Sequence, residues 1–257
     1  MKAGLNLFSL RTKIQTEEDF LQTALQLKEM GYSYLQYSGA EFDAERIRRV
    51  SEASGLPVVL THVPYDRIVN DTERLMEEHA LFGCRNIGLG MVPYHLVDEK
   101  ALCLEAVEKM EKAAEKMAEA GFSFFYHNHQ KEFIKIDGKT YFDRLIEAPH
   151  INFTLDTYWV QNGGEDVVSF LDRLRGRIRC VHLKDYTVGI NPKDPETRKI
   201  VPIFAPVGDG SLNFPKITAK MKECGTEYFL VEQDNAVFYP DPFGQVRRSI
   251  EYIQKEL

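Results

Sequence analysis

The sequence predicts an α/β protein, a (β/α)₈ barrel of the TIM type in which residues 1–257 form a single domain. Eight short apolar runs alternate with eight helical patterns along the chain, the order in which parallel strands and their crossover helices follow one another. The length of 257 residues also suits one such barrel. A doubly wound open sheet is the alternative, but no GxGxxG motif follows the first apolar run.

The first predicted helix illustrates the boundary signals. Thr16 suits its N-cap, Glu17 and Glu18 suit the positive end of its dipole, and Gly31 ends it. Similar patterns continue to the C-terminus. Strands are predicted at residues 4–8, 34–37, 58–62, 86–89, 122–127, 153–156, 178–184 and 228–232, and helices near residues 16–30, 43–54, 66–82, 97–120, 139–147, 166–174, 214–224 and 242–255.

Titratable side chains follow several of the predicted strands, at the end of a barrel where catalytic groups gather. The fifth strand ends in His-Asn-His. His127 and His129 should point the same way and Asn128 the opposite way, because side chains alternate along a strand. The third, sixth, seventh and eighth strands end in further candidates, namely His62, Asp156, His182, Lys184 and Glu232.

Two carboxylates with several imidazoles form a mixed nitrogen and oxygen donor set without a thiolate. Such a set suits Mn²⁺, Co²⁺, Mg²⁺, Fe²⁺ or Zn²⁺, and the residues do not choose among them. A divalent ion there would polarise a carbonyl or hydroxyl as a Lewis acid. A neighbouring carboxylate or imidazole would move a proton to or from the adjacent carbon.

Each of these residues also has a purely structural interpretation. A histidine at a strand end is often a hydrogen-bonded structural residue, Asp156 would serve as a helix N-cap, and Glu232 as an ion-pair partner. Lys184 and Asp185 would form a solvated turn pair. The arrival of such residues on consecutive strands favours a common site over these separate roles. We interpret the remaining histidines as structural: His79, His95 and His150.

Two further features leave alternatives open. Trp159, the only tryptophan, is predicted in the loop after the sixth strand, where it would either stack on a substrate or plug the barrel rim. The glycine-rich segment PVGDGSL, residues 206–212, would hold a phosphate through its backbone amides or form a simple turn. It lacks the GKS/T and helix-opening signals of a phosphate loop, so a turn is favoured.

Composition excludes several classes of function. A net charge of −7 and a pI of about 5.6 argue against nucleic acid as a partner. The four cysteines are scattered without a CxxC pair, which favours reduced thiols in a cytoplasmic protein. We expect no signal peptide and no membrane span, since no stretch approaches the roughly 20 apolar residues that a span requires.

The motifs YHNHQKEF, LDTYWVQNGG, VHLKD, VGDGSLNF and LVEQD occur in this order. This series, with a weaker match at THVP, resembles the sugar phosphate isomerase/epimerase group of the xylose isomerase-like TIM barrels. The resemblance implies one divalent ion, often Mn²⁺, at the barrel mouth, with Asp156, His182 and Glu232 as ligands. Ketose epimerases of this superfamily have a glutamate where this chain has His127, which we therefore expect to be the fourth ligand.

The resemblance implies a metal-dependent sugar isomerase or epimerase that abstracts a proton α to a carbonyl through a metal-stabilised enediolate. We expect catalytic roles for Glu232, His129 and Lys184. We expect substrate contacts from three further residues: His62, Asn128 and Trp159.

Two alternatives remain open. One is a dehydratase or lyase acting on a keto-sugar or keto-inositol, and the other is a non-catalytic sugar-binding barrel. A DNA-repair endonuclease would need a basic face and further metal ligands, which the chain lacks. The expected partner is a small sugar or sugar-derived ketone. Barrels of this kind often pair as homo-oligomers, and the sequence leaves the oligomeric state open.

Overall fold

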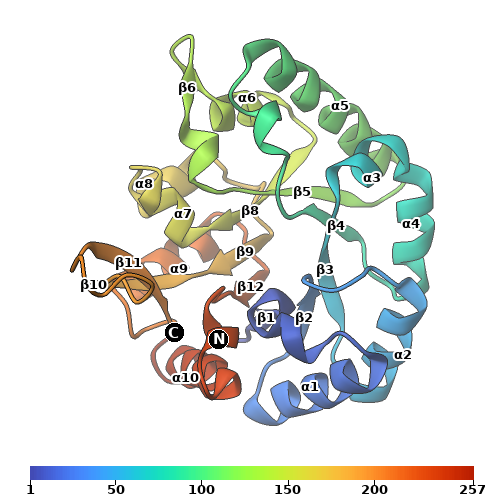
Figure 1. The fold of residues 1–257 in the computed structure, drawn as a ribbon. Coiled ribbons are helices and arrows are strands. Elements are labelled where there is room, and N and C mark those ends of the chain that lie inside the picture. The colour runs from blue at the N-terminus through green and yellow to red at the C-terminus, as the bar shows by residue number, and fades with distance from the viewer.

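The computed structural model describes residues 1–257, and it contains a closed barrel of eight parallel strands surrounded by helices (Figure 1). The strands pair in the order β1-β12-β9-β8-β5-β4-β3-β2. This confirms the predicted fold class. The barrel strands are β1 (Gly4–Asn6), β2 (Tyr34–Tyr37), β3 (Val58–Val63), β4 (Asn86–Leu89), β5 (Ser123–His127), β8 (Ile151–Asp156), β9 (Cys180–Leu183) and β12 (Tyr228–Val231).

The helices lie outside the strands and agree with the predicted pattern in all but two places. The predicted third helix is divided at Asp71, whose φ of −137° lies outside the helical region. An unpredicted helix, α7, follows β8 directly. The helices are α1 (Glu17–Met30), α2 (Ala44–Ser54), α3 (Tyr65–Asn70), α4 (Thr72–Leu81), α5 (Lys100–Glu119), α6 (Tyr141–Glu147), α7 (Thr157–Asn162), α8 (Val167–Asp172), α9 (Phe214–Glu223) and α10 (Pro242–Glu256).

The caps predicted for α1 are present. The Thr16 hydroxyl accepts a hydrogen bond from the Asp19 backbone N–H at 3.1 Å. Gly31 ends the helix in the left-handed region with a φ of 100°, a conformation that costs glycine little. Short 3-10 helices complete the loops: η1 (Leu7–Lys13), η2 (Tyr94–Leu96), η3 (Gln130–Phe133) and η4 (Ala236–Phe238).

Two small antiparallel sheets lie outside the barrel and were not predicted. The smaller one pairs β6 (Lys135–Ile136) with β7 (Lys139–Thr140), and β7 occupies the first two residues of the helix predicted at 139–147. The larger one pairs β10 (Asp185–Ile190) with β11 (Ile200–Ala205) and projects from the barrel as a hairpin (Figure 1). This β10–β11 hairpin begins only two residues after β9 ends, so it stands beside the strand ends that carry the candidate residues.

The lower part of the barrel interior is apolar. Five buried side chains from five different strands form one cluster there: Tyr34, Leu60, Phe125, Cys180 and Leu230. Gly4 leaves room for the Tyr34 ring, because a Cβ at residue 4 would lie only 2.2 Å from Tyr34 Cδ2. The larger core packs the outer faces of the strands against the helices.

Two general expectations can be compared with the structure. All four cysteines are free and buried, as the absence of paired spacings predicts. None of the helices combines the length and the apolar character needed to cross a bilayer.

Candidate metal centre

The candidate residues form a polar layer directly above the apolar layer of the barrel interior. Side chains two residues apart on a strand share a face. In each of the eight strands, the residue two positions beyond the one in the apolar layer therefore belongs to the layer above. This upper layer consists of Asn6, Gln36, His62, Gly90, His127, Asp156, His182 and Glu232.

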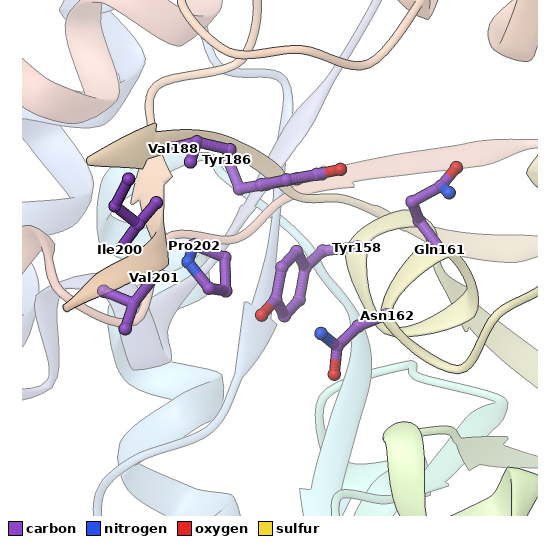
Figure 2. A pocket seen from close by; sticks show the side chains of 8 residues that line it. All are labelled: Tyr158, Gln161, Asn162, Tyr186, Val188, Ile200, Val201 and Pro202. Carbon is purple, nitrogen blue, oxygen red and sulfur yellow. The ribbon is translucent and has the colours of Figure 1, made fainter. Parts of the chain in front are cut away.

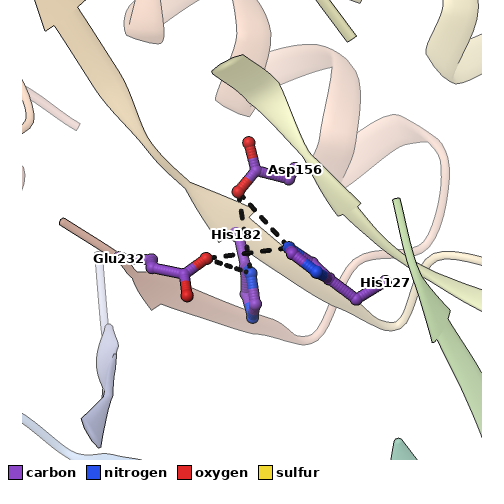
Figure 3. A group of neighbouring side chains, drawn as sticks. All are labelled: His127, Asp156, His182 and Glu232. Carbon is purple, nitrogen blue, oxygen red and sulfur yellow. Dashed lines mark hydrogen bonds and ion pairs between the residues drawn. The ribbon is translucent and has the colours of Figure 1, made fainter. Parts of the chain in front are cut away.

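Four of these residues converge closely. One ligand atom from each of His127, Asp156, His182 and Glu232 lies within 4.8 Å of the other three, and all four residues are buried. His182 Nδ1 lies 2.8 Å from Glu232 Oε2 and 3.8 Å from Asp156 Oδ2. His127 Nε2 lies 3.5 Å from Asp156 Oδ2 and 3.7 Å from Glu232 Oε2. In Figure 3 the two rings and the two carboxylates point toward a common centre.

The outer nitrogen of each ring has a hydrogen-bond acceptor. His182 Nε2 lies 2.6 Å from Gln36 Oε1, and His127 Nδ1 lies 3.0 Å from the Gly90 carbonyl oxygen. Because both oxygens only accept, these outer nitrogens carry the protons. In the neutral rings, His182 Nδ1 and His127 Nε2 therefore direct lone pairs toward the carboxylates. This arrangement is the usual one for histidines that bind a metal.

A cation fits between these groups. Lone pairs that face carboxylate oxygens repel them unless a positive charge lies between, and His182 Nδ1 has no hydrogen-bond partner although Glu232 Oε2 is close. Without an ion this positive charge is a proton on His182. Burial alone would lower the pKa of His182, but Glu232 and Asp156 outweigh it and raise the pKa to about 9. A metal ion would displace this proton and leave the ring neutral. Two imidazole nitrogens and two carboxylates are donors that suit a divalent transition ion.

Lys184 supplies positive charge beside the cluster. It is 1 % exposed, and its Nζ lies 3.5 Å from Glu232 Oε2 and 3.7 Å from Asp156 Oδ2. Burial opposes ionisation of both carboxyl groups, yet Lys184 and the imidazoles lower the pKa of Asp156 to about 2 and also lower the pKa of Glu232. The interpretation of Lys184 and Asp185 as a solvated turn pair is wrong, because both are buried.

Asp234, which was not predicted from the sequence, adds a third carboxylate beside the Lys184 ammonium. Its carboxylate oxygens lie 2.8 and 2.9 Å from Lys184 Nζ. Two further residues were not predicted from the sequence: Asn6, whose Nδ2 donates to Glu232 Oε1 at 2.8 Å, and Gln36, the partner of His182. The strand-end position of Asn6 and Gln36 was the available signal, but neutral amides resemble ordinary loop residues.

The cluster opens into a cavity of about 240 Å³. His62 and His129 line it as predicted, and burial, followed by the neighbouring imidazoles, lowers the pKa of both. His62 Nε2 is buried without a hydrogen-bond partner, whereas the His129 side chain faces the Glu132 backbone N–H in a capping box at the start of η3. The full lining is Phe8, Ser38, His62, Gly90, Met91, His127, His129, Lys184, Glu232 and Asp234.

Asn128 and Trp159 lie elsewhere than expected. Asn128 does not line the cavity, and its Oδ1 accepts a hydrogen bond from the Asp156 backbone N–H at 2.9 Å. It therefore holds the end of β8 rather than facing a substrate. Trp159 lies in the first turn of α7, not in a loop, because Asp156 Oδ1 accepts from the Trp159 backbone N–H at 3.0 Å and caps the helix.

The Trp159 ring forms the wall behind the cavity. It lies 5.4 Å from the His129 ring, and Lys184 Nζ stands 5.1 Å above its centroid. Asp156 thus has both of the roles considered for it, since Oδ1 caps α7 while Oδ2 faces the cluster.

Two other polar segments are structural. Glu132 is buried but accepts hydrogen bonds at 2.7 Å from the Tyr126 hydroxyl and the His129 backbone N–H, so it does not face the cavity. The glycine-rich segment 206–212 is a turn, as favoured. Its amides are occupied by the Asp185 carboxylate, which accepts from Gly208 and Gly210 at 3.0 Å and from Leu212 at 3.2 Å.

A separate cavity of about 280 Å³ lies between α7 and the β10–β11 hairpin (Figure 2). The labelled Tyr158 and Tyr186 hydroxyls and the Gln161 and Asn162 amides are its polar groups. None of its lining residues is titratable near neutral pH, so it is not a second catalytic candidate. The lining is Tyr158, Gln161, Asn162, Tyr186, Val188, Ile200, Val201 and Pro202.

Comparison with known proteins agrees with this fold. The model of the xylose isomerase-like TIM barrel family matches residues 25–256, and the chain belongs to that family. A sugar phosphate isomerase/epimerase from Parabacteroides distasonis superposes with a TM-score of 0.82 at 21% identity, covering 99% of this chain and 94% of that one.

Two curated relatives are inosose dehydratases. That of Geobacillus kaustophilus is 30% identical over 161 residues, which is 58% of this chain and 51% of the relative. That of Geobacillus thermodenitrificans is 25% identical over 181 residues, or 65% and 60%. The matched region thus spans only half to three fifths of these relatives' length.

Proposed function

We propose that the chain is a divalent-metal-dependent isomerase or epimerase of a small sugar or sugar-derived ketone, acting by proton abstraction α to a carbonyl. One observation carries this proposal. Four ligand atoms from four successive barrel positions lie within 4.8 Å of one another at the floor of a cavity. A purely structural layer would not need two carboxylates and two oriented imidazoles there.

The metal would be held by His127, Asp156, His182 and Glu232. When bound, the ion would polarise a substrate carbonyl as a Lewis acid. Mn²⁺ is our first choice, and Co²⁺, Mg²⁺, Fe²⁺ and Zn²⁺ suit the same donors.

The remaining groups suit proton transfer. With Oε2 directed into the cluster as a ligand, Oε1 is the Glu232 oxygen left to accept the α proton, and the hydrogen bond from Asn6 Nδ2 fixes its position. His129 would relay a proton, because its ring lines the cavity 4.6 Å from the ring of His127. Lys184 would stabilise negative charge on the substrate oxygen, because its ammonium borders the cavity.

Dehydration is the second candidate, because the curated relatives are inosose dehydratases. It begins with the same proton abstraction and differs in the loss of a hydroxyl group from the neighbouring carbon. A non-catalytic sugar-binding barrel would use the same cavity without proton transfer.

Solvent exchange tests these alternatives together. The Mn²⁺-loaded protein is incubated in deuterated buffer with a panel of ketoses and inososes, which are then analysed by NMR and mass spectrometry. An isomerase or epimerase incorporates deuterium at the α carbon without loss of water. A dehydratase forms a conjugated enone that absorbs in the ultraviolet, and a binding barrel does neither.

Substitutions of the cluster residues test whether the exchange activity depends on this site. Asp156→Ala and His182→Ala should lose at least a hundredfold in exchange rate and in Mn²⁺ content. His150→Ala is the matched control, because this half-exposed histidine pairs with Glu111 away from the cluster. Exchange at the wild-type rate in Asp156→Ala would refute the proposed site.

A further inference from the structure

A third and larger cavity adjoins the metal-site cavity at the barrel mouth. Its volume is about 860 Å³, and it shares Phe8 and Asp234 with the smaller cavity. Its walls come from η1, from the β10–β11 hairpin and from the segment around η4. We call it the distal groove, lined by Phe8, Arg11, Asn191, Pro192, Lys193, Val201, Pro202, Ile203, Phe204, Asp234, Asn235, Phe238 and Tyr239.

Four aromatic residues line the groove: Phe8, Phe204, Phe238 and Tyr239. Phe238 is 75% and Tyr239 is 38% exposed, which is unusual for neighbouring large apolar residues on a soluble surface. The Phe204 ring lies 4.9 Å from Lys184 Nζ, so the same wall reaches from the groove to the charged residues beside the cluster. Aromatic faces and edges of this kind favour a flat apolar ligand group.

The groove is held in shape by polar contacts behind its aromatic surface. Arg11 Nη1 donates to the backbone oxygens of Phe8 and Asp234, both at 2.9 Å. Its guanidinium also lies 4.4 Å from the Phe8 ring centroid and 5.5 Å from that of Phe238. Asn235 Nδ2 donates to the Phe204 carbonyl at 2.9 Å and ties the hairpin to the η4 segment. A groove formed in advance binds ligands at a lower ordering cost.

The metal-site cavity and the distal groove differ in the size of the ligand that each can hold. The inner cavity, at about 240 Å³, is of the size of a single sugar ring. The distal groove is more than three times as large, and its exposed aromatic residues would stay uncovered if only a free monosaccharide were bound. The combined site is therefore suited to a ligand in two parts.

We propose that the substrate is a keto-sugar derivative that carries an apolar, ring-containing substituent. The sugar part lies at the metal cluster and the substituent lies in the distal groove, against Phe204 and Phe238. The assignment of the sugar part rests on the proposed function. The assignment of the substituent rests on the continuity, size and aromatic lining of the groove.

A pair of non-reacting probes tests this assignment. Binding of methyl and phenyl β-D-glucopyranoside to the Mn²⁺-loaded protein is measured by calorimetry, since the two differ only in the substituent. We expect the phenyl compound to bind at least tenfold more tightly, equivalent to about 1.4 kcal/mol. Phe238→Ala should reduce this preference to less than threefold without affecting folding, because Phe238 is largely exposed.

Ile200→Ala is the matched control. Ile200, at the start of β11, is 69% exposed and therefore comparable in exposure to Phe238, but it does not line the distal groove. It should retain the full phenyl preference. Equal affinity of the wild type for the two probes, no binding of the phenyl probe at millimolar concentration, or an unchanged preference in Phe238→Ala would overturn the assignment.

The outcome is separable from that of the proposed function. Asp156→Ala should weaken both probes but leave their ratio unchanged, because the change lies in the inner cavity. A phenyl preference without any deuterium exchange would refute the proton-transfer function and leave the groove assignment standing. Exchange on sugars without a phenyl preference would refute only the groove assignment.

Discussion

Single residues behind the cluster decide whether its ligand atoms are available. Gln36 accepts from His182 Nε2 at 2.6 Å and so leaves Nδ1 free toward the carboxylates. The Gly90 carbonyl does the same for His127. A Cβ at residue 90 would lie 2.9 Å from His62 Nδ1, so glycine there leaves room for the His62 ring beside the end of β4. The metal site thus depends on residues that would never touch the ion.

Gln36→Leu tests this dependence. Leucine replaces the amide with an apolar side chain of similar size. His182 Nε2 then has no acceptor, so the position of the ring's proton is no longer fixed. We expect Mn²⁺ affinity to fall by about 10–100-fold, measured by calorimetry. Gln22→Leu, on the exposed side of α1, is the control and should bind Mn²⁺ as the wild type does. Wild-type affinity in Gln36→Leu would show that the ring orientation is set elsewhere.

At the scale of elements, buried polar side chains join strands to the segments around them. Asp185 begins β10 and accepts four backbone hydrogen bonds, three of them from segment 208–212 and one from Tyr186 at 2.9 Å. This single carboxylate therefore fixes both the start of the β10–β11 hairpin and the turn that returns from it. His79 joins α4 to β3 in a comparable way.

Asp185→Asn should loosen the turn. The amide removes the charge and replaces one acceptor oxygen with a donor, which leaves at least one backbone N–H of the turn unpaired. We expect a loss of about 1–3 kcal/mol in the free energy of unfolding, with faster amide exchange confined to residues 206–212. Asp209→Asn, in the same turn but partly exposed, is the control. Unchanged exchange in Asp185→Asn would contradict this account.

His79 should make stability depend on pH. Its Nδ1 donates to the Leu75 carbonyl at 2.6 Å and its Nε2 accepts from the Thr61 hydroxyl at 2.7 Å, so the buried ring is neutral. Burial lowers its pKa from 6.5 to about 4, although the Leu75 carbonyl opposes this, and Arg67 adds to the lowering. Between these pH values the unfolded chain binds more protons, so stability falls as the pH decreases.

The measurement is urea unfolding of wild type and His79→Gln between pH 4 and pH 7. The wild type should lose roughly 3 kcal/mol more than the variant on acidification. The variant provides its own control for every other titrating group, because only residue 79 differs. Parallel pH profiles for the two proteins would exclude His79 as the cause.

At the scale of the whole molecule, the barrel gathers ligands from strands that are far apart in the sequence. A bound ion would therefore stabilise the entire closed sheet and not one segment. At Mn²⁺ a hundredfold above its Kd, the folded state should gain about 2.7 kcal/mol, which raises Tm by roughly 5–10 °C. Asp156→Ala should show no rise, as measured by calorimetry with and without a chelator. A rise of equal size in Asp156→Ala would place the ion elsewhere.

The sequence predicts the barrel and its strand ends because alternation of apolar runs and helices is a local signal. The same position at the end of a strand identifies His127, Asp156, His182 and Glu232, which the structure brings together. The hairpin was not predicted, because Gly189 in β10 and Pro202 in β11 are residues that disfavour a strand. Asp234 was missed for another reason, because its role depends on Lys184, 50 residues earlier in the chain.

Each strand contributes to two layers inside the barrel, a lower apolar layer that packs the interior and an upper polar layer that carries the candidate ligands. Cys180 and Leu230 belong to the lower, apolar layer, and the residues two places further along, His182 and Glu232, belong to the polar layer that forms the cluster. A single inserted residue in β9 or β12 would exchange the inner and outer faces beyond it, turning a ligand toward the helices and an apolar side chain toward the centre. Replacements within the lower layer, in contrast, change only its volume. Such a barrel can therefore accept apolar substitutions in its lower layer as long as the number of residues in each strand is unchanged. Insertions and deletions should be tolerated in its loops and not in its strands.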